Sequence, residues 1–201
     1  IEHATYKRIK KEKKAEMAQE KTSAFKIVIY AILALLISRV MLVNNSSPFG
    51  LAFLWALIMS KDIKVSLFSG LGVILGYLSL LKTLETAPFY LMAAVTLMAV
   101  SYIIKGIPRR GRVLFIFLCL LLEGILFNLI ANGYSFGVSI IDASVQTLLV
   151  VPVYFIFMYS VGCFQELSTK HLFSNEEIIS MAILISIAIS GLRGISIFDI
   201  S

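Results

Sequence analysis

The chain has 201 residues, of which 59% are apolar and 15% are charged, and its mean hydropathy is +0.91. A soluble domain of this length needs a polar surface that such a composition cannot supply. The composition therefore excludes a water-soluble enzyme, a disordered chain and a disulfide-stabilised scaffold. It predicts a protein that lies in lipid.

Residues 1–24 form a basic segment that precedes the first apolar run, and they carry much of the formal net charge of +6. We expect this segment to be a cytoplasmic juxtamembrane helix held near anionic lipid. It contains no nucleic-acid-binding motif, so we expect no nucleic-acid partner. The residues expected to contact anionic lipid are Lys7, Arg8, Lys10, Lys11, Lys13 and Lys14.

Residues 25–198 are interpreted as one multi-span transmembrane domain, because they contain seven apolar runs. A bilayer core needs about 20 apolar residues as helix, and the runs lack the alternation of a β-barrel strand. The predicted fold class is all-α, a polytopic transmembrane helical bundle of about seven spans. The expected spans are 25–43, 48–59, 65–81, 87–104, 113–131, 140–163 and 178–192. Because the chain starts at Ile1 and stops just after an apolar run, we expect a truncated fragment.

The second run is short enough to be re-entrant, but the positions of the basic residues favour a crossing. If every run spans, 15 of the 18 lysines and arginines fall on one side. Cytoplasmic loops carry this excess, so the N-terminus and the loop Lys105–Arg112 are expected to be cytoplasmic. The loop Asn132–Ser139 is then external. A re-entrant second run would instead place the arginine-rich loop outside.

Prolines and glycines mark features within the spans. Pro152 lies in the middle of the sixth run and is expected to kink that helix, because proline cannot donate a hydrogen bond to the carbonyl of Leu148. Gly72 and Gly76 form a small-xxx-small pattern in the third run, which lets two helices approach closely. The pattern predicts helix packing within the chain and leaves self-association open.

Three ionisable residues lie within the expected spans. Arg39 is in the outer third of the first, Asp142 is near the outer end of the sixth, and Glu123 is near the middle of the fifth. Such residues are candidates for an ion or substrate pathway. We favour a structural role, an intramembrane ion pair between Arg39 and Asp142, with Glu123 as the alternative partner.

No residue pattern in the chain indicates catalysis. It lacks a glycine-rich phosphate loop, a nucleophile elbow, a zinc-protease motif and a paired aspartate cluster. Cys119 and Cys163 are isolated within apolar runs, which fits small packing residues better than a disulfide or a zinc site. We therefore expect no catalytic, cofactor-binding or metal-binding residue in these positions.

Two stretches of the chain have a distinctive pattern. Residues 38–54 contain Pro48-Phe49-Gly50-Leu51-Ala52-Phe53, and residues 175–195 contain Asn175-Glu176-Glu177-Ile178-Ile179 and Ser190-Gly191-Leu192-Arg193-Gly194. With Arg39 in the first span and Asp142 at the head of the sixth, the order of features resembles the N-terminal membrane region of stage II sporulation protein E, most strongly in these two stretches. Glu123 matches nothing in the family pattern.

The resemblance implies a function. It implies an integral membrane anchoring and localisation module in the cell membrane, at the polar division septum, of a sporulation serine/threonine phosphatase. The family's membrane region has about ten spans, followed by a regulatory segment linked to self-association and to the division-ring protein FtsZ. A manganese-dependent phosphatase domain, a hydrolase, lies further downstream. None of its residues falls within these 201 positions.

A fragment of a small secondary transporter or permease is the alternative. That function needs discontinuous helices and polar groups that converge near the middle of the membrane. Only Glu123 and Pro152 offer such features, and they lie on different predicted helices.

Overall fold

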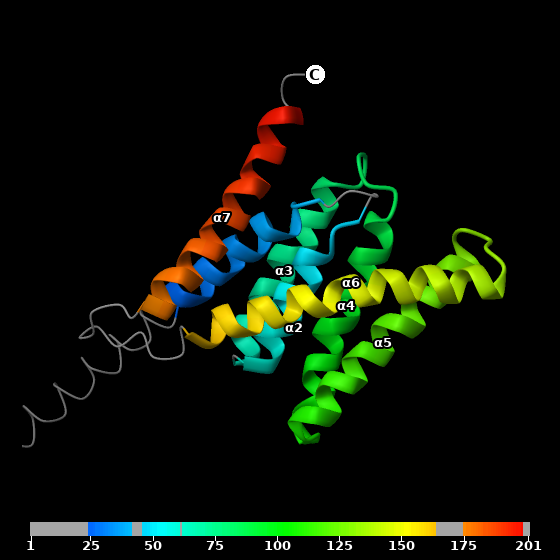
Figure 1. The fold of residues 1–201 in the computed structure, drawn as a ribbon, viewed down its shortest axis with the longest axis horizontal. Coiled ribbons are helices and arrows are strands. Elements are labelled where there is room, and N and C mark those ends of the chain that lie inside the picture. The colour runs from blue at the N-terminus through cyan, green and yellow to red at the C-terminus, as the bar shows by residue number, and fades with distance from the viewer. Residues whose placement is uncertain (1–23, 42–45, 61, 164–174, 199–201) are drawn as a thin grey trace, which may run out of the picture.

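The computed structural model describes residues 24–41, 46–60, 62–163 and 175–198. All of the regular elements in these ranges are helices. This confirms the all-α class for these residues (Figure 1). The basic segment 1–23 lies outside the described residues, so its expected lipid contacts stay a prediction. The helices are Ala24–Ser38 (the first helix), α2 (Pro48–Ser60), α3 (Ile63–Ser79), α4 (Ala87–Ile103), the 3-10 helix η1 (Ile104–Gly106), α5 (Arg109–Ile130), α6 (Phe136–Cys163) and α7 (Asn175–Phe198).

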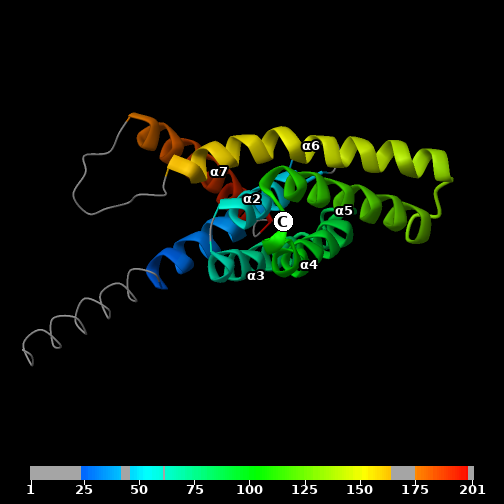
Figure 2. The ribbon, with the colours of Figure 1, turned by 90° about the horizontal axis from the view of Figure 1, so that it is seen from below.

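Helix α2 lies at the centre of the molecule, between the first helix, α3, α4 and α6 (Figures 1 and 2). Every side chain from Leu51 to Leu57 is at most 1% exposed. Pro48 is its first residue, where the missing N–H costs no helical hydrogen bond. Aromatic contacts fix the helix against α6, because Phe53 meets Phe157 edge-on and Trp55 stacks on Tyr154. Phe53 also packs against Tyr30 of the first helix.

Helices α5 and α6 form a long hairpin whose loop end extends beyond the other helices, at the right of Figures 1 and 2. α5 is buried along one narrow stripe with a four-residue spacing, formed by Ile116, Leu120, Gly124 and Asn128. The remaining faces expose leucines, and only 22% of its most apolar window is buried. Such a surface is stable only in an apolar solvent.

Two helices, Arg109–Ile130 and Phe136–Gly162, are long and apolar enough to cross a membrane. The first helix, α2, α3 and α4 are apolar but have 10–17 residues in their described parts. At 1.5 Å per residue they rise by about 15–26 Å, which is less than a bilayer core of about 30 Å. The structure therefore supports two spans, and the expected number of seven stays a prediction.

Two expected loops are shorter than the sequence analysis placed them. α5 begins at Arg109, so the arginine-rich segment is its first turn, and Pro108 precedes that turn in an extended conformation that suits a helix start. α6 begins at Phe136, four residues before the apolar run, which reduces the expected external loop 132–139 to a turn that ends at Ser135.

The first and last helices also end at unexpected residues. The first helix ends at Ser38, so Arg39 follows the helix instead of lying within it. The Ser47 hydroxyl lies 3.0 Å from the Ser38 carbonyl oxygen and 2.8 Å from that of Val40, which satisfies carbonyls that a continuing helix would have bonded. α7 continues through Gly191 and Gly194 to Phe198, beyond the expected end of the last run at residue 192.

Candidate functional site

The three ionisable residues singled out by the sequence have separate polar partners. Arg39 Nη1 donates to Ser79 Oγ at 2.9 Å, which links the end of the first helix to α3. Asp142 Oδ2 accepts hydrogen bonds from Asn128 Nδ2 at 2.8 Å and from Gln146 Nε2 at 3.0 Å. The Arg39–Asp142 ion pair therefore stays a prediction, in competition with these observed contacts.

Glu123 has a hydrogen-bond partner of its own, on α4. Its Oε1 accepts a hydrogen bond from Thr96 Oγ1 at 3.0 Å, which joins α5 to α4. The same two residues line a shallow apolar cavity of about 370 Å³ with Leu91, Met92 and Val95 of α4. The second carboxylate oxygen of Glu123 is buried without a hydrogen-bond partner among the described residues. The hydrogen bond between Thr96 and Glu123 links α4 to α5.

A tyrosine hydroxyl holds the first turn of α2. The Tyr77 hydroxyl, from α3, donates to the Ser47 carbonyl at 2.7 Å and accepts from the Leu51 N–H at 3.1 Å. These are the two groups that a direct helical hydrogen bond between residues i and i+4 would join. Gly50 leaves room for this contact, because a Cβ there would lie 2.6 Å from the hydroxyl. The hydroxyl therefore connects α3 to the start of the central helix.

Further buried groups complete this junction, which we call the Tyr77 junction (Ser38, Ser47, Tyr77 and Tyr90). Tyr90 of α4 stacks on Tyr77 with ring centroids 5.3 Å apart. Its hydroxyl also forms a hydrogen bond with the Ser47 backbone. All four side chains are at most 1% exposed. The junction joins the first helix, α2, α3 and α4 at one end of the molecule.

Glycines pack tightly against the backbone of the first helix. A Cβ at Gly72 would lie 2.3 Å from the Ala31 carbonyl oxygen, and one at Gly76 would lie 2.8 Å from that of Leu35. A Cβ at Gly191 of α7 would lie 2.0 Å from the Leu36 carbonyl oxygen. The first helix therefore packs closely against Gly72 and Gly76 of α3 and against Gly191 of α7.

Pro152 lies inside α6, which continues as a helix on both sides of it. The proline ring has no N–H to donate to the Leu148 carbonyl, as the sequence predicts. Val151 and Tyr154 flank this position and line a cavity against α5.

Several residues that form these contacts were not singled out from the sequence. Tyr77 lies inside an apolar run, where its hydroxyl needs a partner once buried, and this was the signal that could have found it. Ser47 and Gly50 lie in the stretch that carried the family resemblance, but their contacts depend on α3, which is distant in sequence. Gly191 lies near the end of the last expected run, and its close contact with the first helix was not predicted.

The contacts within the described residues are structural in chemistry. They consist of paired hydroxyls, amides and carboxylates, and they include no group of three or more histidine, cysteine or acidic side chains that could hold a metal ion. An all-helical architecture, two helices that can cross a bilayer and wide exposed apolar faces define the class as a helical membrane protein.

The chain belongs to the family described as SpoIIE, N-terminal domain, whose family model matches residues 1–201. This confirms the resemblance drawn from the sequence. No curated protein and no solved structure matches the chain.

Proposed function

We propose that this chain is a multi-pass anchoring and localisation module, with a cytoplasmic N-terminus, for a sporulation serine/threonine phosphatase at the asymmetric division septum. One observation carries the anchoring role: α5 and α6 expose many large apolar side chains, and both helices are long and apolar enough to cross a bilayer. Membership of the SpoIIE N-terminal domain family supports the link to sporulation and to the membrane.

The proposal places the chemistry outside these residues. A manganese-dependent phosphatase domain would follow the membrane region, and FtsZ and further copies of the protein would be its partners at the septum. The module itself would need a rigid helical core and a lipid-facing surface. The enclosed α2 and the exposed α5–α6 hairpin provide these two features.

The arrangement of basic residues supports the topology. Arg109 and Arg112 of α5 share one cavity, of about 430 Å³, with Ser60 at the end of α2 and Gly162 near the end of α6. The ends of these three helices therefore meet on one side of the molecule. If α2 crosses the membrane, as the positions of the lysines and arginines predict, this side is the cytoplasmic one.

The observed polar contacts argue against the transporter alternative. A transporter needs polar groups that converge on a substrate near the middle of the membrane. Here Glu123 bonds to Thr96, whereas Asp142 bonds to Asn128 and Gln146, so the acids belong to separate clusters. Each cluster joins neighbouring helices.

Cysteine labelling tests the topology. Cys119 and Cys163 are first replaced by serine, and single cysteines are then introduced at Gly106 and at Ser135. Both positions are exposed, and a Cβ at Gly106 meets nothing within 4 Å. In intact cells a membrane-impermeant maleimide should label Ser135→Cys, whereas Gly106→Cys should react only after permeabilisation. The reverse pattern would contradict the cytoplasmic N-terminus.

Localisation is tested separately. The chain, fused to a fluorescent protein at its N-terminus, which the proposed topology places in the cytoplasm, is produced in a sporulating bacterium and compared with the same reporter on an unrelated multi-span anchor. Enrichment at the asymmetric septum, relative to that control, is the expected result. An even distribution in the membrane would leave anchoring intact and overturn the localising role.

A further inference from the structure

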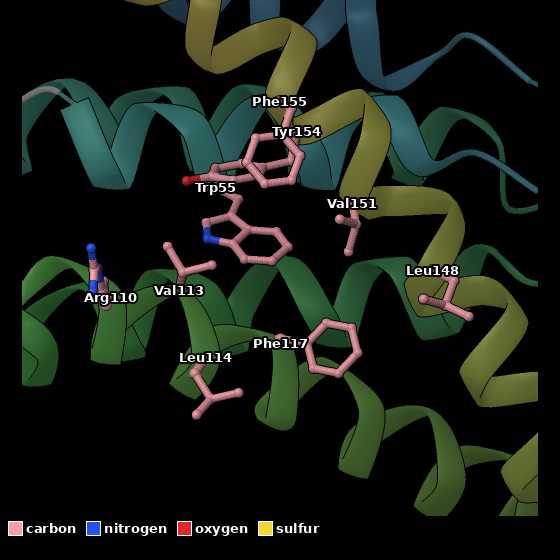
Figure 3. Close-up of a pocket in the computed structure, with 9 residues that line it drawn as sticks. All are labelled: Trp55, Arg110, Val113, Leu114, Phe117, Leu148, Val151, Tyr154 and Phe155. Atoms are coloured by element: carbon pink, nitrogen blue, oxygen red, sulfur yellow. The ribbon is translucent and has the colours of Figure 1, made fainter.

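A cleft between α2, α5 and α6 changes from cationic to apolar along its length. At its end, Arg109 and Arg112 line the cavity of about 430 Å³ with Met59 and Met158. One helical turn deeper, Trp55 and Tyr154 line a second cavity, of about 310 Å³, with Arg110 at its edge (Figure 3). We name the two cavities together the arginine cleft.

The lining residues of all three helices follow the same order along the cleft, from the arginine end to the deeper, apolar end. Met59 follows Trp55 by four residues on α2, and Met158 follows Tyr154 by four on α6, so each pair lies on one helix face a turn apart. α5 runs the other way: its arginines come first, and Val113 and Phe117 line the deeper cavity. From Arg109 to Phe117 the helix rises by about 12 Å.

Two buried donors in the cleft have no partner. Trp55 is 1% exposed, and its indole Nε1 makes no hydrogen bond to the described residues. The same holds for Nε of Arg112. Figure 3 shows the indole nitrogen on the side of Val113 and Arg110. A buried N–H without an acceptor is costly, so these groups call for a ligand that brings oxygen atoms into the cleft.

The charges select the kind of ligand. None of the carboxylates in the described part of the chain forms an ion pair with Arg109, Arg110 or Arg112. Guanidinium groups bind phosphate oxygens through paired, charge-assisted hydrogen bonds. The deeper cavity offers aromatic and aliphatic side chains that suit a hydrocarbon chain.

We propose that the arginine cleft is a specific site for one anionic phospholipid, with its phosphate at the three arginines and an acyl chain along Trp55, Tyr154 and Phe117. Basic pockets between membrane helices on the cytoplasmic side are the usual place for anionic headgroups. The inference rests on the proposed function only in requiring that the chain lies in a bilayer. The site would link the position of the module to the local content of anionic lipid.

The chain contains a single tryptophan, and it lies in this cleft, so its fluorescence reports on the occupant. The 201-residue chain is reconstituted into phosphatidylcholine nanodiscs that contain a small fraction of lipid brominated on the acyl chain, either phosphatidylglycerol or phosphatidylcholine. Bromine quenches tryptophan at short range. We expect brominated phosphatidylglycerol to quench Trp55 at about one fifth of the mole fraction that brominated phosphatidylcholine requires. Both lipids carry a phosphate, but only phosphatidylglycerol has a net negative charge, and about 1 kcal/mol for that charge beside a basic side chain corresponds to about fivefold.

Two matched pairs of variants identify the site. Replacing Arg109, Arg110 and Arg112 by glutamine should abolish the preference for the anionic lipid, whereas replacing the exposed Lys26, Lys64 and Lys82 by glutamine should preserve it. Gly162→Leu should also abolish it, because this glycine lines the arginine end and its Cβ direction is open. Gly137→Leu is the control, since it is equally open, on the same helix and outside the cleft.

Other outcomes would overturn the proposal. Equal quenching by the two brominated lipids, or a preference that survives in the arginine and Gly162→Leu variants, would show ordinary bilayer contact only. If soluble glycerol phosphate relieved the quenching, the arginines would bind a free anion instead of a lipid. If oligoglutamate relieved it, they would bind an acidic protein segment. Any of these results would leave membrane anchoring intact, whereas failure of the chain to enter nanodiscs would reject anchoring itself.

Discussion

Helices α2 and α5 are both built almost entirely from apolar residues after their first turn, but their surroundings differ. α2 is enclosed by the first helix, α3, α4 and α6, whereas α5 buries one stripe and exposes the rest. In lipid an apolar side chain gains little by moving from the bilayer to the protein interior. Shape and polar contacts therefore decide which helix becomes central. α2 has both, through its aromatic neighbours and the Tyr77 junction.

The largest effect should come from matched leucines on the two helices. Leu54 of α2 is fully buried, and Leu122 of α5 is 59% exposed. Leu54→Ala leaves a cavity in the centre and should lower the free energy of unfolding by about 3 kcal/mol. Leu122→Ala removes contacts with lipid or detergent and should cost less than about 1 kcal/mol. Denaturant unfolding of the purified variants in one detergent measures both values.

A similar loss for the two leucine variants would contradict the comparison. It would mean that the exposed face of α5 is covered by protein, either by further residues of a longer chain or by a second copy. Crosslinking of the Leu122→Cys variant, in a background without Cys119 and Cys163, would then separate these two cases.

A smaller effect should come from the hydroxyl that fixes the start of α2. Tyr77→Phe keeps the stacked ring but leaves the Ser47 carbonyl and the Leu51 N–H without their buried partner. It should lower the free energy of unfolding by about 1–2 kcal/mol. Tyr134→Phe, on an exposed tyrosine in the α5–α6 turn, is the control and should change it by less than about 0.5 kcal/mol. If both variants were neutral, the hydroxyl would not contribute to the position of α2.

The sequence predicted where the helices lie along the chain better than it predicted which residues pack around each helix. The expected runs 48–59 and 87–104 placed the starts of α2 and α4 correctly, and each helix has a proline in its first turn, where the missing N–H costs no helical hydrogen bond. The start of α5 was missed, since Arg109–Arg112 was interpreted as a loop on the basis of its charge. Arginine is a good helix former, and Pro108 was the local signal for a helix that begins four residues earlier.

The site contacts depend on long-range packing, which a single sequence does not encode in any local pattern. Nothing near Tyr77 indicates that its hydroxyl meets residues 47 and 51 on another helix. The central position of α2 is equally hidden, because its composition suits a lipid-facing helix as well as a buried one. The isolated Trp55 was visible in the sequence, but the three helices that form a cleft around it were not.

The smallest effect concerns Arg39, for which the sequence and the structure favour different partners. From the sequence we expect Arg39 to lie within a span, close to the outer end, and to form an ion pair with Asp142. In the structure the first helix ends at Ser38, the residue before Arg39. The Arg39 guanidinium donates to Ser79 Oγ, and the Ser79 hydroxyl donates to the Gly76 carbonyl. Asp142 bonds to two side-chain amides.

Double-variant cycles with Arg39→Leu, Ser79→Ala and Asp142→Asn decide between these partners, with unfolding in detergent as the measurement. Residues in direct contact show coupling energies of at least about 0.5 kcal/mol, whereas separate sites add within that limit. We expect coupling of about 0.5–1 kcal/mol for Arg39 with Ser79, because the hydrogen bond is charge-assisted but partly exposed. We expect additive losses for Arg39 with Asp142, since two amides already donate to Oδ2 of this carboxylate. Coupling in the second cycle instead would restore the predicted ion pair and would connect the end of the first helix directly to α6.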